Sequence, residues 1–347
     1  MPQGGSLTLP SAAYTALVNP IGLLGFLRPP PRLEQLLPAA RRTVERARWV
    51  QIDANHLRAT ARRLAEEGVP VPPWAQPYHF SDGGPRTVAY VVLLDSLNFC
   101  FWGEPRWAVE YRGQRYSGYP ALAASLKRAF EEEMPLWEAR HLERLQEEEA
   151  RVLFRGEGEL PLFRQRLAIL RGVGRALRRR WAGEFTALIE EADGSAAGLV
   201  GLLAAHLPGF DDAPRLGTQR VPFYKRAQIC AADLWGAFGG QEWGAFMDLD
   251  RLTAFADYKL PQILRHWRVL TYAPALARRV DALEPLRAGS REEIELRAAT
   301  VWAVEQLRRE LGHFGVSLRS FELDWALWSA AQGLEMAPHH RTLTIRY

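Results

Sequence analysis

The pattern of apolar residues from Pro120 to the C-terminus constrains the fold of this chain most. Over most of that length, apolar side chains recur at the three- and four-residue spacing of an α-helix, and glycine, proline or aspartate separates one such stretch from the next. The expected helices cover residues 120–133, 135–154, 160–180, 182–192, 196–206, 223–238, 259–269, 273–282, 290–311 and 321–333. The sequence therefore predicts a mainly α-helical protein.

The part of the chain before Pro120 is more varied. Residues 1–40 are interrupted repeatedly by proline and are expected to form an irregular lead-in. Residues 41–67 show helical spacing again. Residues 70–86 carry five prolines and two glycines, which predicts a loop.

A small β element is expected near residues 87–118. The apolar run Val88–Leu94 fits either a buried strand or the start of a buried helix, and periodicity does not decide between them. The segment Trp107–Tyr116 alternates and turns at Gly113, which predicts a β-hairpin. Residues 338–347 alternate like a strand too, and they are apolar enough to be expected to dock against the body of the protein.

Length and composition set the class of protein. The 347 residues suffice for roughly two domains, although one large domain is also compatible. We expect residues 41–347 to form one body, in which two helical lobes with a site between them are one arrangement. A content of 48% hydrophobic and 24% charged residues excludes a disordered, collagen-like or disulfide-framework chain. Only Cys100 and Cys230 are present, which indicates a reducing compartment.

No targeting or membrane segment is visible. The N-terminus lacks the basic start and apolar run of a signal peptide, and no apolar stretch of about 18 residues is present. We therefore expect a cytoplasmic protein without a membrane partner.

The basic residues are strongly biased toward arginine. Of the 44 lysines and arginines, only Lys127, Lys225 and Lys259 are lysine, which leaves 41 arginines against 40 acidic residues. Because glutamates are interleaved with the arginines, the pattern indicates ion-paired helix faces and argues against a stable nucleic-acid partner. A lysine retained in such a chain merits inspection, since only its ammonium is a compact, titratable charge.

Familiar cofactor signatures are absent from the sequence. There is no His-Glu-x-x-His pattern, no glycine-rich phosphate loop and no dinucleotide fingerprint after a strand. The sequence therefore argues against a zinc site.

Two segments place polar side chains among large apolar ones. Asp95 and Asn98 stand in a run of leucine, phenylalanine and tryptophan, where burial costs free energy unless they are hydrogen-bonded. They suit recognition of a flat heterocycle, while a helix N-cap at Asp95 is the structural alternative. Lys225 and Asp233 are spaced to share a helix face, with Lys225 facing an acid or a phosphate, or simply reaching solvent.

Two further acids lie beside aromatic residues. Asp257, between Phe255 and Tyr258, precedes a predicted helix and fits an N-cap, yet such surroundings also tune a catalytic carboxylate. Asp324 and Trp328 are four residues apart and share one helix face.

Six ordered motifs give this chain a resemblance to a known family. The motifs are LDSLNFCFW, RYSGYPAL, VPFYKRAQICAADLW, LTAFADYKLPQIL, LDWALW and PHHRTLTIRY. In this order they resemble the queuosine salvage family of queuosine 5′-phosphate N-glycosidases, from about residue 40 to the C-terminus. The resemblance implies a helical fold related to the helix-hairpin-helix DNA glycosylases. It also implies hydrolysis of queuosine 5′-monophosphate to queuine and ribose 5-phosphate without a metal or redox cofactor.

The resemblance also implies roles for particular residues. Queuine is a flat 7-deazaguanine that carries a cationic aminomethyl arm with a cyclopentenediol. Asp257 would stabilise the positive charge that forms on the ribose in the transition state. It would act either as the nucleophile or as the base that activates water. Lys225 would bind the 5′-phosphate or orient Asp257. Phe255 and Trp328 would stack on the base, and Asp324 would accept from its guanine-like edge.

The remaining implied contacts are less sharply assigned. They are Asp95, Asn98, Asp250 and His79 toward the diol and the aminomethyl nitrogen, Asp233 and Tyr258 elsewhere in the site, and Arg341 and Tyr347 at the phosphate end. Lys259 is expected to be replaceable by arginine. The alternative function is a helix-hairpin-helix protein or glycosylase that acts on polynucleotide, which predicts a basic face.

Overall fold

The structure, a computed structural model, describes residues 31–347 and is mainly helical, as predicted. Its α-helices are α1 (Leu36–Glu45), α2 (Ala54–Glu67), α3 (Pro85–Leu97), α4 (Tyr119–Glu131), α5 (Ala139–Arg144), α6 (Glu147–Leu153), α7 (Phe163–Arg180), α8 (Phe185–Glu190), α9 (Ala196–His206), α10 (Lys225–Ala237), α11 (Lys259–His266), α12 (Pro274–Asp281), α13 (Arg291–His313) and α14 (Ser320–Ala330). The strands form three antiparallel pairs: β1 (Val50–Ile52) with β6 (Leu270–Tyr272), β2 (Ala108–Tyr111) with β3 (Gln114–Ser117), and β4 (Arg215–Leu216) with β5 (Gln219–Arg220). Short 3-10 turns complete the list at Leu33–Gln35, Glu242–Gly244 and Leu249–Arg251.

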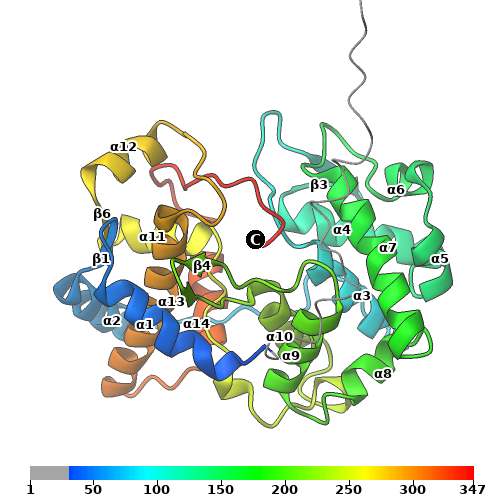
Figure 1. The fold of residues 1–347 in the computed structure, drawn as a ribbon, viewed down its shortest axis with the longest axis horizontal. Helices are drawn as coiled ribbons and strands as arrows, with labels where there is room; N and C mark the ends of the chain where they lie inside the picture. The colour runs from blue at the N-terminus through cyan, green and yellow to red at the C-terminus, as the bar shows by residue number, and fades with distance from the viewer. Residues whose placement is uncertain (1–30) are drawn as a thin grey trace, which may run out of the picture. The chain divides into compact units, whose positions relative to one another are not determined.

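The helices pack around two apolar cores. In the first, α3 and α10 are buried along most of their length, and α4, α7, α8 and α9 pack around them. In the second, α13 is central and contacts α1, α2, α11 and α14. Figure 1 shows these two groups of helices side by side within the described part of the chain. Segments distant in sequence therefore meet where the groups adjoin.

The ambiguous run Val88–Leu94 is helical, as part of α3. The helix begins after Gly84 with Pro85 in its first turn, where a missing N–H costs nothing. Every residue from Thr87 to Leu97 is buried, so the sequence has no polar stripe that would indicate the helical period. The β element is thus confined to the predicted hairpin, which is confirmed: β2 and β3 join through Arg112-Gly113, both with positive φ.

Other boundaries differ from the expectation. Residues 41–67 do not form one helix, because β1 lies between α1 and α2 and pairs with β6. α1 begins at Leu36, within the expected lead-in, of which residues 1–30 lie outside the described residues. Residues 135–154 contain α5 and α6, since Gln146 closes a capping box that starts a new helix. None of the helices in residues 31–347 is long and apolar enough to cross a bilayer.

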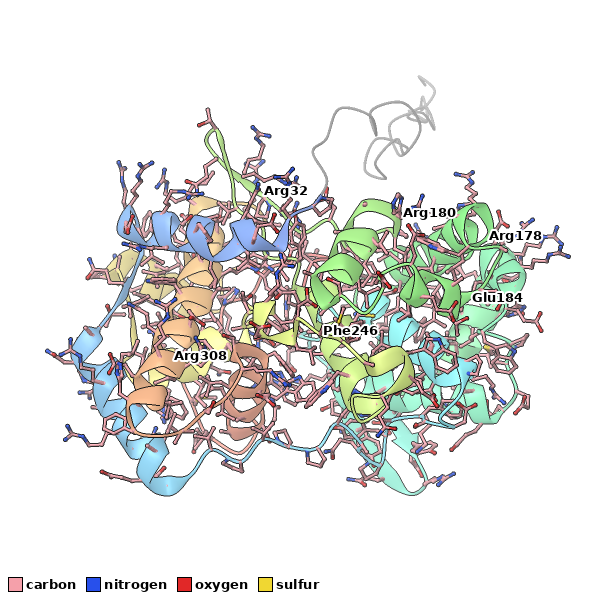
Figure 2. The ribbon with its side chains drawn as sticks, turned by 90° about the horizontal axis from the view of Figure 1, so that it is seen from below. Arg32, Arg178, Arg180, Glu184, Phe246 and Arg308 are labelled. Atoms are coloured by element: carbon pink, nitrogen blue, oxygen red, sulfur yellow. The ribbon has the colours of Figure 1, made fainter. Side chains whose placement is uncertain are left out.

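Many of the arginines on helix surfaces are ion-paired, as their interleaving with glutamates predicted. Near the end of α7, Arg178 pairs with Glu143 and Arg180 pairs with Glu191. Both arginines lie at the solvent-facing end of this helix (Figure 2). Exposed ion pairs of this kind contribute about 0–1 kcal/mol each, so they add little to the free energy of unfolding.

The C-terminal segment is docked but is not a strand. Cys100 N donates to Tyr347 O at 2.9 Å, and Leu286 N donates to Arg341 O at 2.7 Å. Tyr347 is only 2% exposed. The segment therefore contacts the loop after α3 at one end and the α12–α13 connection at the other. Because the segment makes isolated backbone hydrogen bonds and no regular ladder with a neighbouring strand, the predicted docking is confirmed and the predicted strand is wrong.

Candidate active site

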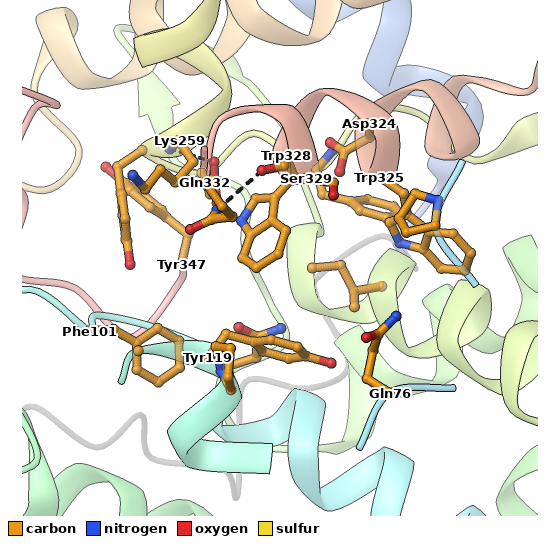
Figure 3. Close-up of a pocket in the computed structure, with 18 of the residues that line it drawn as sticks. Gln76, Phe101, Tyr119, Lys259, Asp324, Trp325, Trp328, Ser329, Gln332 and Tyr347 are labelled. Carbon is orange, nitrogen blue, oxygen red and sulfur yellow. Dashed lines mark hydrogen bonds between the residues drawn. The ribbon is translucent and has the colours of Figure 1, made fainter. Parts of the chain in front are cut away.

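A pocket of about 470 Å³ lies where the two groups of helices adjoin, a volume in the usual range for a small ligand. In Figure 3, Asp324, Trp325 and Trp328 of α14 line one wall, and Gln76, Phe101 and Tyr119 lie opposite. The lining includes these predicted site residues: His79, Asn98, Lys225, Asp233, Phe255, Asp257, Tyr258, Asp324, Trp328 and Tyr347. Segments far apart in sequence thus meet around one cavity.

The Asp257 carboxylate has one bonded and one free oxygen. Its Oδ1 accepts from Lys259 N at 2.7 Å and from Leu260 N at 3.0 Å, which satisfies two N–H groups at the start of α11. Asp257 therefore caps the start of α11 with its side chain, although it stands one residue before the N-cap position, which Tyr258 occupies. Within residues 31–347, Oδ2 has no hydrogen-bond partner, although the side chain is only 7% exposed. The cap fixes the carboxylate and leaves Oδ2 available in the pocket.

Lys225 does not reach solvent; it is the first residue of α10 and is 5% exposed. Its Nζ donates to Asn98 O at 3.4 Å. Burial lowers the pKa of Lys225, while the negative charges of Asp257, Asp95 and Asp324 act in the opposite direction. The ammonium thus stands among carboxylates and serves as their shared counter-charge.

Asp257 and Lys225 stabilise each other's ionised forms. Burial raises the pKa of Asp257, and the Lys225 charge is the largest influence that lowers it. Conversely, Asp257 is the largest influence that keeps Lys225 protonated. Neutralising one member of this buried pair therefore shifts the pKa of the other.

Asp324 supports the loop that carries Asp257. Its Oδ2 accepts from Phe255 N at 2.7 Å, which fixes the backbone two residues before Asp257. Burial, reinforced by the Asp257 charge, raises the pKa of Asp324 well above its usual range. With one oxygen used by the protein, Asp324 has its second oxygen left for a ligand. The predicted shared face of Asp324 and Trp328 is present, since both line the pocket.

Two more acids lie deeper, on α3 and α10. Asp95 is fully buried in the last turn of α3 and does not line the pocket; the N-cap alternative is therefore wrong. Its Oδ1 accepts from Asn98 Nδ2 at 3.3 Å. Asp233 lines the pocket, and burial raises its pKa to about 7. Oδ2 of each carboxylate is buried without a hydrogen-bond partner within the described residues.

His79 belongs to the pocket wall. Its Nε2 lies 2.8 Å from the Tyr119 hydroxyl, and its ring stacks on Trp74 with centroids 4.4 Å apart. Burial lowers the pKa of His79 to about 4, so the ring is neutral at pH 7. A neutral imidazole in this position orients Tyr119 and carries no charge toward a ligand.

Besides Asp95, the structure does not bring two predicted residues, Asp250 and Arg341, to the pocket. Asp250 is exposed on the 3-10 turn Leu249–Arg251, where Leu249 takes the buried position and turns the next side chain outward. Arg341 lies behind Trp102, with its guanidinium 5.6 Å from the ring centroid and 4.0 Å from Glu104. Neither lines the cavity.

Several lining residues were not predicted. Six of them are large aromatic residues: Trp74, Tyr78, Phe101, Trp102, Tyr119 and Trp325. Tyr119 and Trp328 meet edge to face at 5.9 Å. Trp74 and Tyr78 belong to the proline-rich loop, where two large aromatic residues among prolines were a signal that sequence reasoning passed over.

A buried arginine behind the pocket joins the two catalytic candidates. Arg297 of α13 donates to both Asp212 oxygens, at 2.9 and 2.5 Å, and its Nε donates to Ala256 O at 3.1 Å. Asp212 Oδ2 also accepts from Lys225 N at 3.4 Å. The backbone on either side of the Lys225–Asp257 pair is thereby fixed to one guanidinium.

The donors of the pocket do not form a metal centre. Within the described part of the chain, no three or more histidine, cysteine, aspartate or glutamate side chains are placed to hold a metal ion. The carboxylates are instead matched to Lys225 and to backbone N–H groups.

Known proteins match almost the whole chain. A family profile described as "Queuosine salvage protein" matches residues 78–347. A Sphaerobacter thermophilus protein named Queuosine 5′-phosphate N-glycosylase/hydrolase is 47% identical over 314 residues, which are 90% of this chain and 97% of that protein. Proteins of the same name from Mus musculus and Dictyostelium discoideum are 33% and 36% identical, over 89% and 75% of this chain and 97% and 78% of theirs. The chain belongs to the queuosine salvage protein family.

Proposed function

We propose that this protein hydrolyses the N-glycosidic bond of queuosine 5′-monophosphate and releases queuine and ribose 5-phosphate. The observation that carries the proposal is the Asp257 carboxylate, fixed through Oδ1, free at Oδ2 and under the influence of the Lys225 charge in an aromatic pocket. The relatives with this activity in their names support it over most of the chain.

The geometry suits a transition state with positive charge on the ribose. As the bond from C1′ to the base nitrogen breaks, its electron pair leaves with the base and C1′ becomes cationic. Oδ2 of Asp257 stabilises that charge, and it either bonds to C1′ or takes a proton from the attacking water. In both routes water supplies hydroxide to C1′ and a proton to the base. The Lys225 charge favours the ionised form of Asp257, and the N–H groups of Lys259 and Leu260 hold the carboxylate in place.

The other pocket residues fit the base. Phe255 and Trp328 offer ring faces to the flat deazaguanine, and Asp324 accepts from its donor edge. Asp233, with a free buried oxygen and Asp95 behind it, receives the cationic arm, while Asn98 and His79 contact the diol. Tyr258 and Tyr347 complete the ribose end.

The remaining expectations accompany this proposal. The placement of a lysine at a helix start beside an aspartate before another helix supports a relation to the helix-hairpin-helix glycosylases. The paired surface arginines support a mononucleotide substrate and no stable nucleic-acid partner. We also propose a cytoplasmic location, and one functional body over residues 41–347 with the pocket between its two cores.

The direct test is incubation of the purified protein with queuosine 5′-monophosphate, with free queuine followed by chromatography. Release of queuine together with an equimolar amount of ribose 5-phosphate supports the function. Release only from a queuosine-containing tRNA fragment would favour a polynucleotide substrate, and no release from either would refute the glycosidase proposal.

Replacing Lys225 with methionine is expected to move the acid limb of the rate profile to higher pH. Activity requires ionised Asp257, and burial already raises the pKa of this carboxyl. Removing the Lys225 charge removes the main influence that lowers that pKa, so protonation and loss of kcat/KM begin at higher pH. Measurement of kcat/KM against pH checks this; Lys127→Met, which changes a lysine outside the pocket, should leave the limb unmoved. An unmoved limb in Lys225→Met would show that the two groups are not coupled.

Truncation of Trp328 to alanine is expected to weaken substrate binding through loss of a stacking face. Stacking of a base on an aromatic ring is worth about 1–3 kcal/mol, so KM should rise by about 5- to 150-fold with a smaller change in kcat. Steady-state kinetics measure this, and Trp328→Phe should recover most of the loss. An equal KM for the alanine and phenylalanine variants would argue against stacking.

A further inference from the structure

One end of the pocket carries cations that the protein does not pair. Arg106, from the loop before β2, and Lys259, from the first turn of α11, both line the cavity. Within residues 31–347, neither side chain makes a hydrogen bond or an ion pair. This leaves positive charge facing the ligand space.

The two cations are close enough to influence each other. Burial lowers the pKa of Lys259, and the Arg106 charge lowers it further, against the opposing effect of Asp257. His339 lies at the same end, with its ring stacked on Tyr258 at 4.4 Å. Burial lowers the pKa of His339 to about 4, and the charge of Lys259 contributes to that shift. Two unpaired cations held in proximity favour an anion as ligand.

The other cations at or near the pocket already interact with acids or with backbone oxygen. Lys225 lies among three acids, Asp257, Asp95 and Asp324, and donates to Asn98 O, so it is less available to an incoming anion. Arg341 is 4.0 Å from Glu104 and does not line the cavity. Three acids act on Lys225, whereas Asp257 is the acid that acts on Lys259.

We propose that Arg106 and Lys259 form the subsite for the 5′-phosphate of the substrate, with the stacked Tyr258 and His339 rings as its wall. The inference rests on the proposed function and deepens it. In a 5′-nucleotide the phosphate is a few bonds from C1′, so its subsite must adjoin the carboxylate that serves C1′. Lys259 follows Asp257 by two residues, and both belong to the start of α11. The pair of cations therefore selects the phosphorylated substrate over the nucleoside.

The test compares hydrolysis of queuosine 5′-monophosphate with hydrolysis of queuosine. In Arg106→Ala and in Lys259→Ala, kcat/KM for the nucleotide should fall by about 10- to 100-fold, the scale of a lost hydrogen bond to a charged group. The rate for the nucleoside should fall far less, so the preference for phosphate collapses. Lys259→Arg should retain the preference, and Arg62→Ala, an exposed arginine of α2, serves as the matched control. An equal loss for both substrates, or no loss for either, would overturn the subsite.

A binding measurement separates the subsite from the catalytic proposal. Calorimetric titration of the intact protein with ribose 5-phosphate and with ribose needs no turnover. Tighter binding of ribose 5-phosphate, weakened in Arg106→Ala and Lys259→Ala, would support the subsite even if no hydrolysis occurred. Equal binding of ribose and ribose 5-phosphate by an active enzyme would overturn the subsite and leave the glycosidase function intact.

Discussion

Asp257→Asn is expected to lower kcat for queuine release by about 1,000-fold or more, the scale on which one group that stabilises transition-state charge contributes. The asparagine oxygen can still accept from Lys259 N and Leu260 N, so the start of α11 is preserved. What disappears is the negative charge opposite the cationic ribose, together with the nucleophile or base at Oδ2. Single-turnover release of queuine, followed by chromatography, measures the loss.

The control for this prediction uses another aspartate. Asp250→Asn changes an exposed carboxylate outside the pocket and should retain the wild-type rate. Equal urea midpoints for Asp257→Asn and the wild type would show that the fold is intact. Undiminished release by Asp257→Asn would refute the assigned role, and a loss in Asp250→Asn would show that the exposed 3-10 turn takes part in the reaction.

Periodicity predicted helices where one face is polar and failed where burial is complete. Residues 196–206 match α9 at both ends, because Ser195 caps the helix and marks its start in the sequence. The run within α3 was ambiguous because both faces are buried, so it has no polar stripe. β1 and β6 were missed because each is three residues long and exists only through pairing with a distant segment.

The site was predicted where polar residues interrupt apolar runs and missed where aromatic residues look like core. Asp257, Lys225 and Asp324 stood out because burial of a charge needs a reason. Tyr119 and Trp325 gave no such signal, since a large aromatic residue on a helix is ordinarily packed inside. Their role depends on which helices adjoin, and that is a property of tertiary packing that local pattern does not contain.

Arg297→Met is expected to lower the free energy of unfolding by about 3–5 kcal/mol, the scale on which loss of one partner of a buried ion pair acts. Arg297 is fully buried and Asp212 is 3% exposed. Burial alone would raise the pKa of Asp212, but the Arg297 charge and hydrogen bonds hold it below its usual range. Without the guanidinium, a buried carboxylate and the carbonyl of Ala256 lose their donors. Urea unfolding followed by circular dichroism measures the change.

A matched surface arginine and a double variant make the prediction specific. Arg308→Met, on the same helix and 35% exposed, removes a pair with Glu305, which keeps Arg309, and should cost about 0–1 kcal/mol. Because Arg297 and Asp212 form one unit, Asp212→Asn should add little further destabilisation to Arg297→Met, whereas independent sites would add. Since the same guanidinium holds the backbone beside both Lys225 and Asp257, the Arg297 variant should also lower kcat under conditions where it remains folded. Full activity in a folded Arg297→Met protein would show that the ion pair serves stability alone, because the catalytic pair would then keep its geometry without the guanidinium.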